Sequence, residues 1–112
     1  MRSDPLDRAF QALADRTRRG VVDLLREEPR RAGDLAARLR VSPPALTRHL
    51  KILRDSRIVE ELDDPTDGRA SIYRLRRETF SHLREWVDHV EALWSENLAS
   101  FAAHVVNRRD GK

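Results

Sequence analysis

The chain has 112 residues, of which 39% are hydrophobic and 37% are charged, and it carries a formal net charge of +3. This balance excludes a membrane protein and a disordered chain, and the lack of cysteine excludes disulfides, thiolate metal sites and cysteine nucleophiles. Because no apolar run approaches the ~18 residues that cross a bilayer, and residues 1–7 are charged where a signal peptide needs an apolar stretch, we expect a cytoplasmic protein.

Two helices are predicted at the start of the chain. Apolar residues at helical spacing mark the first over 5–14, which Asp4 and Pro5 begin as an N-cap and first-turn pair. Asp15 then caps a second helix, which has an apolar inner face and ends before Pro29. Each helix has one apolar side, and each of these sides must be buried against other elements.

A third and a fourth helix follow after short connections. The third is predicted over 32–39, and a tight turn separates it from the fourth. Ser42 before Pro43 is a typical helix start, and it predicts the fourth helix over 43–55. This helix buries one apolar face and leaves a polar outer face. The residues of the buried face are Leu46, Leu50 and Leu53.

The periodicity then changes from roughly 3.6 towards 2, which predicts strands. Two short strands, 58–62 and 70–75, are joined by the turn-rich stretch 63–68 and form an antiparallel hairpin. Tyr73 and Arg74 lie on opposite faces of the second strand, and we expect Tyr73 to pack inward.

A long helix is predicted over 78–106, and Ser95 leaves open whether it is continuous. Its apolar residues recur in steps of three and four and form a continuous apolar seam along the helix. A single domain, expected over 1–107, is too small to cover this seam alone. A second copy would cover the seam across a twofold axis, with the first helix beside it, and a purely intramolecular core is the alternative. A disordered tail is expected over 108–112. The residues expected at the dimer interface are Phe10, Leu13, Val87, Val90, Leu93, Trp94, Leu98 and Phe101.

This element order predicts a mainly α-helical fold with a small β-hairpin, a winged helix-turn-helix that dimerises through its terminal helices. Positive charge is concentrated in residues 1–57, which hold fourteen Lys or Arg against eight Asp or Glu. Such a basic face suits a protein that binds a polyanion such as DNA, although a solvated basic surface gives the same pattern.

The fourth helix begins with the small and polar side chains that a helix in the major groove needs. Arg48 is the first candidate for reading guanine, with a phosphate contact or a solvated arginine as the alternatives. Arg69 at the hairpin tip either reaches the minor groove or is a solvated turn residue. His49 either bonds a phosphate or has a structural role. The residues expected to contact DNA are Ser42, Pro44, Thr47, Arg48, His49, Lys51 and Arg69.

Three segments occur in a fixed order along the chain. They are ALADRTRRGVVDLL at 12–25, VSPPALTRHLKILRDSRIVE at 41–60 and the wing DGRASIYRL at 67–75. In these segments the chain resembles the ArsR family of bacterial regulators, over about residues 6–106. The resemblance implies a winged-helix dimer that represses its own operon and leaves DNA when an effector or a cellular state changes, and the sequence does not identify the effector.

No metal site or other cofactor is expected. Metal-sensing members of the family often have cysteines where this chain has residues 31–34, and their ligand spacing on the last helix is not matched at 88–89. The ending at 94–98 resembles the branch of the family without metal ligands. Three side chains of the last helix share one face but lack a fourth ligand. They are His82, Glu85 and His89.

We therefore expect a sequence-specific DNA-binding transcription regulator, an operator-binding repressor that acts as a homodimer on an imperfectly palindromic double-stranded operator. The alternative is a winged-helix protein–protein interaction module. An enzyme is not expected, since the chain has no glycine-rich phosphate loop and no cluster of acid, base and nucleophile.

Overall fold

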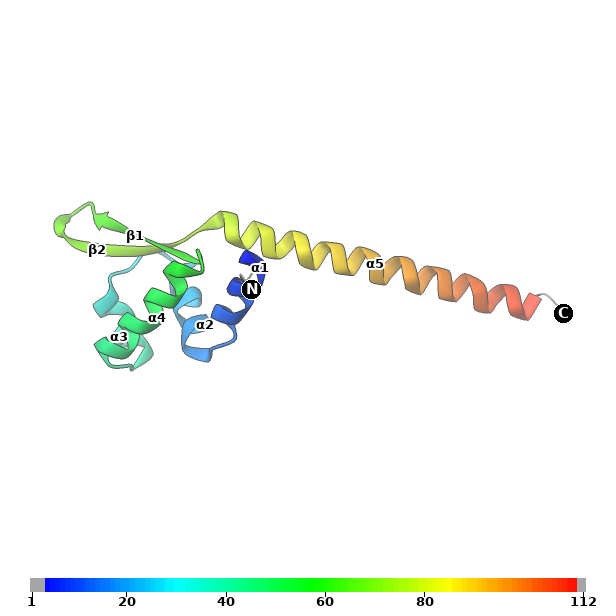
Figure 1. Cartoon of the computed structure of the whole chain (residues 1–112), viewed down its shortest axis with the longest axis horizontal. Coiled ribbons are helices and arrows are strands. Elements are labelled where there is room, and N and C mark those ends of the chain that lie inside the picture. The colour runs from blue at the N-terminus through cyan, green and yellow to red at the C-terminus, as the bar shows by residue number, and fades with distance from the viewer. Residues whose placement is uncertain (1–3, 111–112) are drawn as a thin grey trace. The chain divides into compact units, whose positions relative to one another are not determined.

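The computed structural model describes the backbone of residues 4–110 and the side chains of residues 4–105. It is mainly helical with one two-stranded antiparallel hairpin, as the sequence predicts (Figure 1). The chain divides after Phe80 into two compact units, and the second begins within the last helix. The elements in chain order are α1 (Pro5–Leu13), α2 (Arg16–Leu25), α3 (Ala32–Leu39), α4 (Pro43–Asp55), β1 (Val59–Asp64), β2 (Asp67–Leu75) and α5 (Arg77–Asp110).

Three of the helices begin with the side-chain caps that the sequence predicts. The carboxylate of Asp4 accepts a backbone N–H of α1 at 2.8 Å, and that of Asp15 accepts one of α2 at 3.0 Å. The hydroxyl of Ser42 accepts a backbone N–H of α4 at 3.3 Å. Such caps satisfy donors that the first turn leaves unpaired, and each typically stabilises a protein by about 1 kcal/mol. The local sequence therefore determines where α1, α2 and α4 begin.

The core of the first unit is built from the apolar faces of α1 to α4 and the start of the hairpin. Helices α2 and α3 approach closely at Gly20, where an added Cβ would lie 2.8 Å from a methyl carbon of Leu39. The predicted inner face of α4 is confirmed, since Leu46, Leu50 and Leu53 are all at most 2% exposed. The buried apolar residues are Ala9, Ala12, Val21, Leu25, Leu35, Ala36, Leu46, Leu50, Leu53, Ile58, Val59 and Tyr73.

The hairpin is longer than predicted and its turn is shorter. Strands β1 and β2 pair as far as Asp64 opposite Asp67, so residues 65–66 alone form the turn that we predicted over 63–68. The reason is a side chain. The Asp64 carboxylate accepts the Thr66 N–H at 2.8 Å and the Thr66 hydroxyl at 2.7 Å, and these bonds close a tight turn.

Arg30 joins the helices to the hairpin. Its side chain is 6% exposed, and its guanidinium donates to the Leu24 carbonyl at 3.2 Å, to Glu27 at 2.7 Å and to Asp34 at 3.0 Å. Its backbone exchanges two hydrogen bonds, of 3.1 and 2.8 Å, with Tyr73 of β2. Tyr73 is 9% exposed, which confirms that it packs inward. One arginine thus connects the C-terminal end of α2, the start of α3 and the hairpin.

A second arginine holds the turn of the hairpin. Arg31 donates from Nε at 2.7 Å to Oδ2 of Asp64, and its Nη2 lies 2.6 Å from the same oxygen. The Thr66 backbone N–H and hydroxyl, followed by Arg31, lower the pKa of Asp64 from 3.8 to about 2, because all three bond the charged carboxylate. We call the Arg31–Asp64 contact the wing clamp, since it ties the loop before α3 to the turn 33 residues later.

Helix α5 is a single helix of 34 residues. It passes through Ser95 without a break, which answers the question that the sequence left open. The tail predicted to be disordered, 108–112, lies partly in this helix, and residues 111–112 lie outside the described part. The span predicted as one domain, 1–107, extends over both compact units. Among the described residues, no helix combines the length and the apolar character needed to cross a membrane.

Removal of a core side chain from α4 should destabilise the fold far more than removal of its exposed neighbour. Leu53 is 0% exposed and Ile52 is 41% exposed. We expect Leu53→Ala to lower the free energy of unfolding by about 2–5 kcal/mol, because it leaves a cavity. Ile52→Ala should cost less than about 1 kcal/mol. Urea denaturation measures both, and equal losses would contradict this description of the core.

The bonds of the Asp64 carboxylate should make stability depend on pH. Because the folded pKa of Asp64 lies below its ordinary value, its bonds to Thr66 and to Arg31 stabilise the fold fully above about pH 4, and this stabilisation is lost as the pH falls towards 2. We expect Asp64→Asn to lower Tm by several degrees at pH 7, and the difference from wild type to shrink on acidification. Thermal melts at several pH values test this. A difference that stays constant from pH 7 to pH 2 would contradict it.

Candidate nucleic-acid interface

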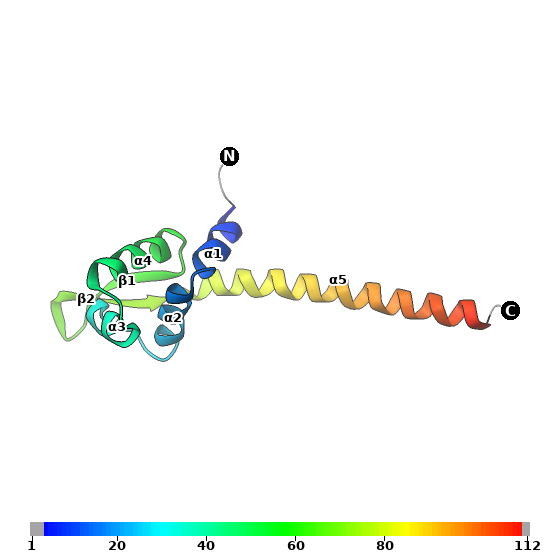
Figure 2. The same ribbon diagram turned by 90° about the horizontal axis from the view of Figure 1, so that it is seen from below.

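Helix α4 presents one face to solvent along its whole length. Helix α3 packs against α4, and α4 packs against β1 (Figures 1 and 2), so the short helices and the hairpin together hold it. Its leucines are buried on the inner side. Six of the seven residues predicted to contact DNA lie on α4 or at its cap, and the seventh lies on the hairpin. The exposed residues of α4 among them are Pro44, Thr47, Arg48 and Lys51.

The exposed polar side chains of α4 differ in how much of their bonding capacity is in use. The Thr47 hydroxyl donates to the Pro43 carbonyl at 2.9 Å, so its oxygen can still accept a bond. Lys51 forms an ion pair of 2.8 Å with Asp55, in which both side chains are about two-thirds exposed. Such a surface pair is weak and can exchange for another anion. Arg48 has no hydrogen bond or ion pair within the described residues.

Ser42 and His49 are engaged by the protein itself. The Ser42 hydroxyl caps α4. His49 is turned towards α2, where its Nδ1 lies 3.3 Å from Nη1 of Arg18 and 3.9 Å from Oδ2 of Asp15. The backbone N–H of Arg18 is the main cause of a lowered pKa at Asp15, with smaller contributions from the charges of Arg18 and His49. These contacts favour the structural interpretation of His49 that the sequence left open.

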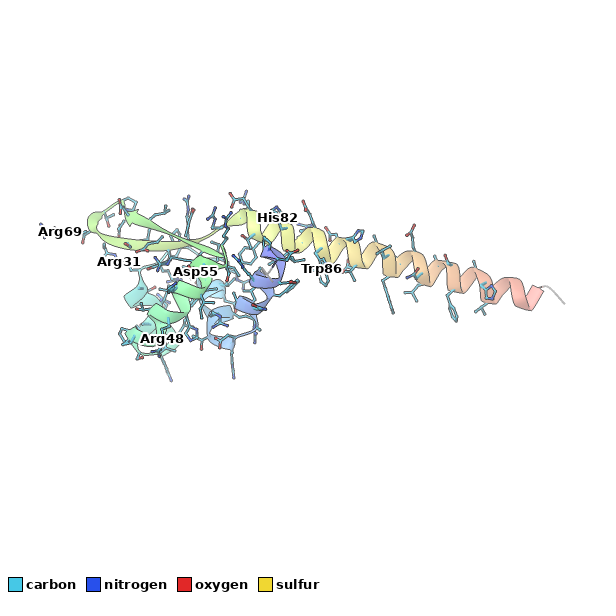
Figure 3. The ribbon with its side chains drawn as sticks, in the orientation of Figure 1. Arg31, Arg48, Asp55, Arg69, His82 and Trp86 are labelled. Carbon is cyan, nitrogen blue, oxygen red and sulfur yellow. The ribbon has the colours of Figure 1, made fainter. Side chains whose placement is uncertain are left out.

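The hairpin carries the second exposed arginine. In Figure 3, Arg69 projects from the free end of the hairpin while Arg48 lies on α4. The backbone N–H of Arg69 donates to Asp67 at 3.1 Å, which shapes the turn, and its side chain forms no bond within the part of the chain that the structure describes. Arg74, on the same strand, is instead paired with Glu60 across the hairpin.

The turn between α3 and α4 contains a residue that the sequence analysis did not single out. Arg40 ends α3 in the left-handed conformation, with φ 56° and ψ 43°. A residue with a Cβ loses roughly 1–2 kcal/mol there, and glycine is the usual choice. The Arg40 side chain is exposed and forms no hydrogen bond or ion pair among the described residues. No glycine marks this position in the sequence, so the turn gave no signal for it.

Helix α5 exposes a series of large apolar side chains. The predicted interface residues on it are 42–67% exposed in the single chain. On α1, Phe10 is 40% exposed. The exposed large apolar residues of α5 are Trp86, Val87, Val90, Leu93, Trp94, Leu98, Phe101 and Val105.

The structure brings together no group of acidic, histidine or cysteine side chains suited to a metal ion, so far as the described residues extend. His82, Glu85 and His89 of α5 therefore do not form such a site with other residues of the described chain.

The helix-turn-helix has a recognisable sequence. A family model described as "Bacterial regulatory protein, arsR family" matches residues 15–61. HTH-type transcriptional regulator Rv2034 of Mycobacterium tuberculosis is 38% identical over 104 residues, which cover 93% of this chain and 92% of that protein. Transcriptional repressor SdpR of Bacillus subtilis is 29% identical over 82 residues, which cover 73% of this chain and 88% of that protein.

Solved structures share the fold. An ArsR-like transcriptional regulator from Rhodococcus sp. RHA1 matches with a TM-score of 0.75 and 30% identity, over 87% of this chain and 89% of that one. The homodimeric winged helix-turn-helix DNA-binding domain of Mb0332 from Mycobacterium bovis matches in fold, with a TM-score of 0.63 and 24% identity, over 84% of each chain. The chain therefore belongs to the ArsR family of bacterial regulatory proteins and is a DNA-binding transcription regulator rather than an enzyme.

Proposed function

We propose that this protein is a homodimeric repressor that binds an imperfectly palindromic operator in the cytoplasm. Helix α4 enters the major groove and reads bases through Arg48, while Arg69 at the hairpin tip reaches the adjacent minor groove. One observation carries the proposal. The side chains of Arg48 and Arg69 are exposed and form no hydrogen bond or ion pair in the described chain, whereas those of Arg30 and Arg31 are held by carboxylates. Guanidinium groups without internal partners are available for an external anion.

The remaining predicted residues take supporting positions in this proposal. The Thr47 oxygen can accept a bond from a base edge, and Pro44 lets the first turn approach the groove closely. Lys51 exchanges Asp55 for a phosphate. Ser42 sets the start of α4. His49 contributes by holding α4 against α2.

The proposed dimer rests on the apolar side chains of α5. Trp94 is 64% exposed, Phe101 is 67% exposed and Leu98 is 50% exposed in the single chain. Contiguous apolar surface of this kind marks an interaction site. A second copy fits because a twofold dimer places two α4 helices about one DNA turn apart, roughly 34 Å, which matches a palindrome. The predicted contributions of Val87, Val90 and Leu93, and of Phe10 and Leu13 on α1, belong to the same interface. The Mb0332 domain, which has the same fold, is described as homodimeric.

Repression is supported by the relative SdpR, which is named a transcriptional repressor. A dimer bound to an operator blocks access of other proteins to the same DNA.

DNA binding and its salt dependence test the proposed function. The wild-type protein is titrated into a labelled duplex from the region upstream of its own gene and into a scrambled duplex, at several salt concentrations. We expect specific binding that weakens steeply with salt. Arg48→Ala should weaken operator binding about 10–100-fold and reduce the preference over the scrambled duplex, because it removes a base contact.

Lys51→Ala is the matched control on the same helix face. It should weaken binding to both duplexes by the same factor, since a phosphate contact carries no sequence information. A shallow salt dependence, or equal binding to both duplexes by wild type and Arg48→Ala, would contradict an operator-binding role and favour a protein-docking module.

The proposed dimer interface predicts that variants which lose dimerisation also lose DNA affinity. We expect Leu93→Ala and Trp94→Ala to shift the monomer–dimer equilibrium towards monomer and to weaken DNA binding together, because each half-site then binds alone. Glu85→Ala is the control, since nine residues at about 100° each place Glu85 opposite Trp94 on α5. Sedimentation velocity measures the equilibrium. Sedimentation coefficients that remain unchanged in both apolar variants would rule out this interface.

A further inference from the structure

Arg40 has a backbone conformation that disfavours its own side chain. With φ 56° and ψ 43°, it lies in the left-handed region, where glycine is the least strained residue. Its backbone N–H closes the end of α3 on the Ala37 carbonyl at 3.3 Å, a bond that any residue except proline could make. The folded chain therefore gains nothing from a guanidinium at this position.

The Arg40 side chain is also unengaged. It is exposed, and within the described residues its guanidinium takes part in no hydrogen bond or ion pair. Nearby Arg38 differs, because it bonds Asp34 at 3.0 Å. An exposed guanidinium without an internal partner is available for an external anion.

The position of Arg40 indicates the ligand. It stands in the turn between α3 and α4, two residues before Ser42, the cap of α4. In the proposed function the first turn of α4 enters the major groove, so this corner meets the sugar-phosphate backbone at the edge of the groove. A guanidinium there matches a phosphodiester, with which it forms charge-assisted hydrogen bonds.

We propose that Arg40 is a DNA-contacting residue that binds a backbone phosphodiester beside the groove entered by α4. This inference rests on the proposed function and extends its site to the turn before α4. Arg40 fixes the depth and register of α4, and Arg48 reads the bases.

Arg57 provides a matched control. It is the other side-chain-bearing residue with a positive φ among the described residues, 57°, and its side chain is likewise exposed. It follows the C-terminal end of α4, so the whole helix, about 20 Å long at 1.5 Å per residue, lies between it and Arg40 in the chain. Replacement of either arginine by glycine therefore removes the same charge and relieves the same kind of strain, at opposite ends of one helix.

The experiment compares wild type, Arg40→Gly, Arg40→Lys and Arg57→Gly in two measurements, Tm and DNA affinity over a range of salt. The probes are the upstream duplex and the scrambled duplex. For Arg40→Gly we expect an unchanged Tm or an increase of a few degrees, together with a roughly 3–10-fold loss of affinity for both duplexes. The slope of log affinity against log salt should fall by about one per bound protomer.

The controls separate a phosphate contact from general effects. Arg40→Lys should keep most of the salt slope, and Arg57→Gly should keep the DNA affinity while showing the same Tm behaviour as Arg40→Gly. Equal losses of DNA affinity in Arg40→Gly and Arg57→Gly would mean that the loss follows from the lower net charge alone, and this would overturn the proposal. A lower Tm in Arg40→Gly would assign Arg40 a structural role and would also overturn it.

The same measurements show whether a failure concerns the Arg40 contact or the proposed DNA-binding function itself. If wild type prefers the upstream duplex and Arg40→Gly binds as tightly as wild type, the Arg40 contact is wrong and the proposed function stands. If wild type binds neither duplex, both are wrong.

Discussion

The buried guanidinium of Arg30 is the interaction on which the geometry of the first unit depends. A guanidinium covered by the protein requires partners, and they come from the C-terminal end of α2, from Glu27 and from Asp34 of α3. The same residue exchanges backbone bonds with Tyr73 of the hairpin. The side chain of Arg30 therefore holds the end of α2 and the start of α3 together, while its backbone anchors the wing beside them, and the wing clamp of Arg31 and Asp64 adds a contact at the turn.

The arginines of this protein differ in what their side chains bond. Arg30, which is buried, and Arg31, whose side chain is about half exposed, are paired with carboxylates. Those at the proposed DNA surface, Arg40, Arg48 and Arg69, face solvent without such partners in the described chain. A formal net charge of only +3 is therefore compatible with a strongly positive local surface, because internal pairing removes much of the charge elsewhere.

The features that the sequence predicted are local ones. The caps at Asp15 and Ser42 act within three residues, and the periodicity of α4 places its leucines on one side, so both were predictable from short windows. The wing clamp joins residues 33 positions apart in the chain, and no short pattern encodes it. The hairpin turn was predicted too long because the Asp64 side chain, rather than turn propensity, closes it. The left-handed conformation of Arg40 could not be predicted from the sequence, because no glycine marks the position.

The lack of internal partners at Arg48 and Arg69 has a consequence for how such regulators diversify. A substitution at either position breaks no side-chain bond in the described chain and exposes no buried group, so the fold tolerates most replacements with little loss of stability. After gene duplication, one copy can change these residues one at a time and drift towards a new operator while it remains fully folded at each step. Arg30 allows no such freedom, because its side chain bonds three groups at once. Two paralogous regulators in one cell can thus become independent switches through changes confined to the outer surface.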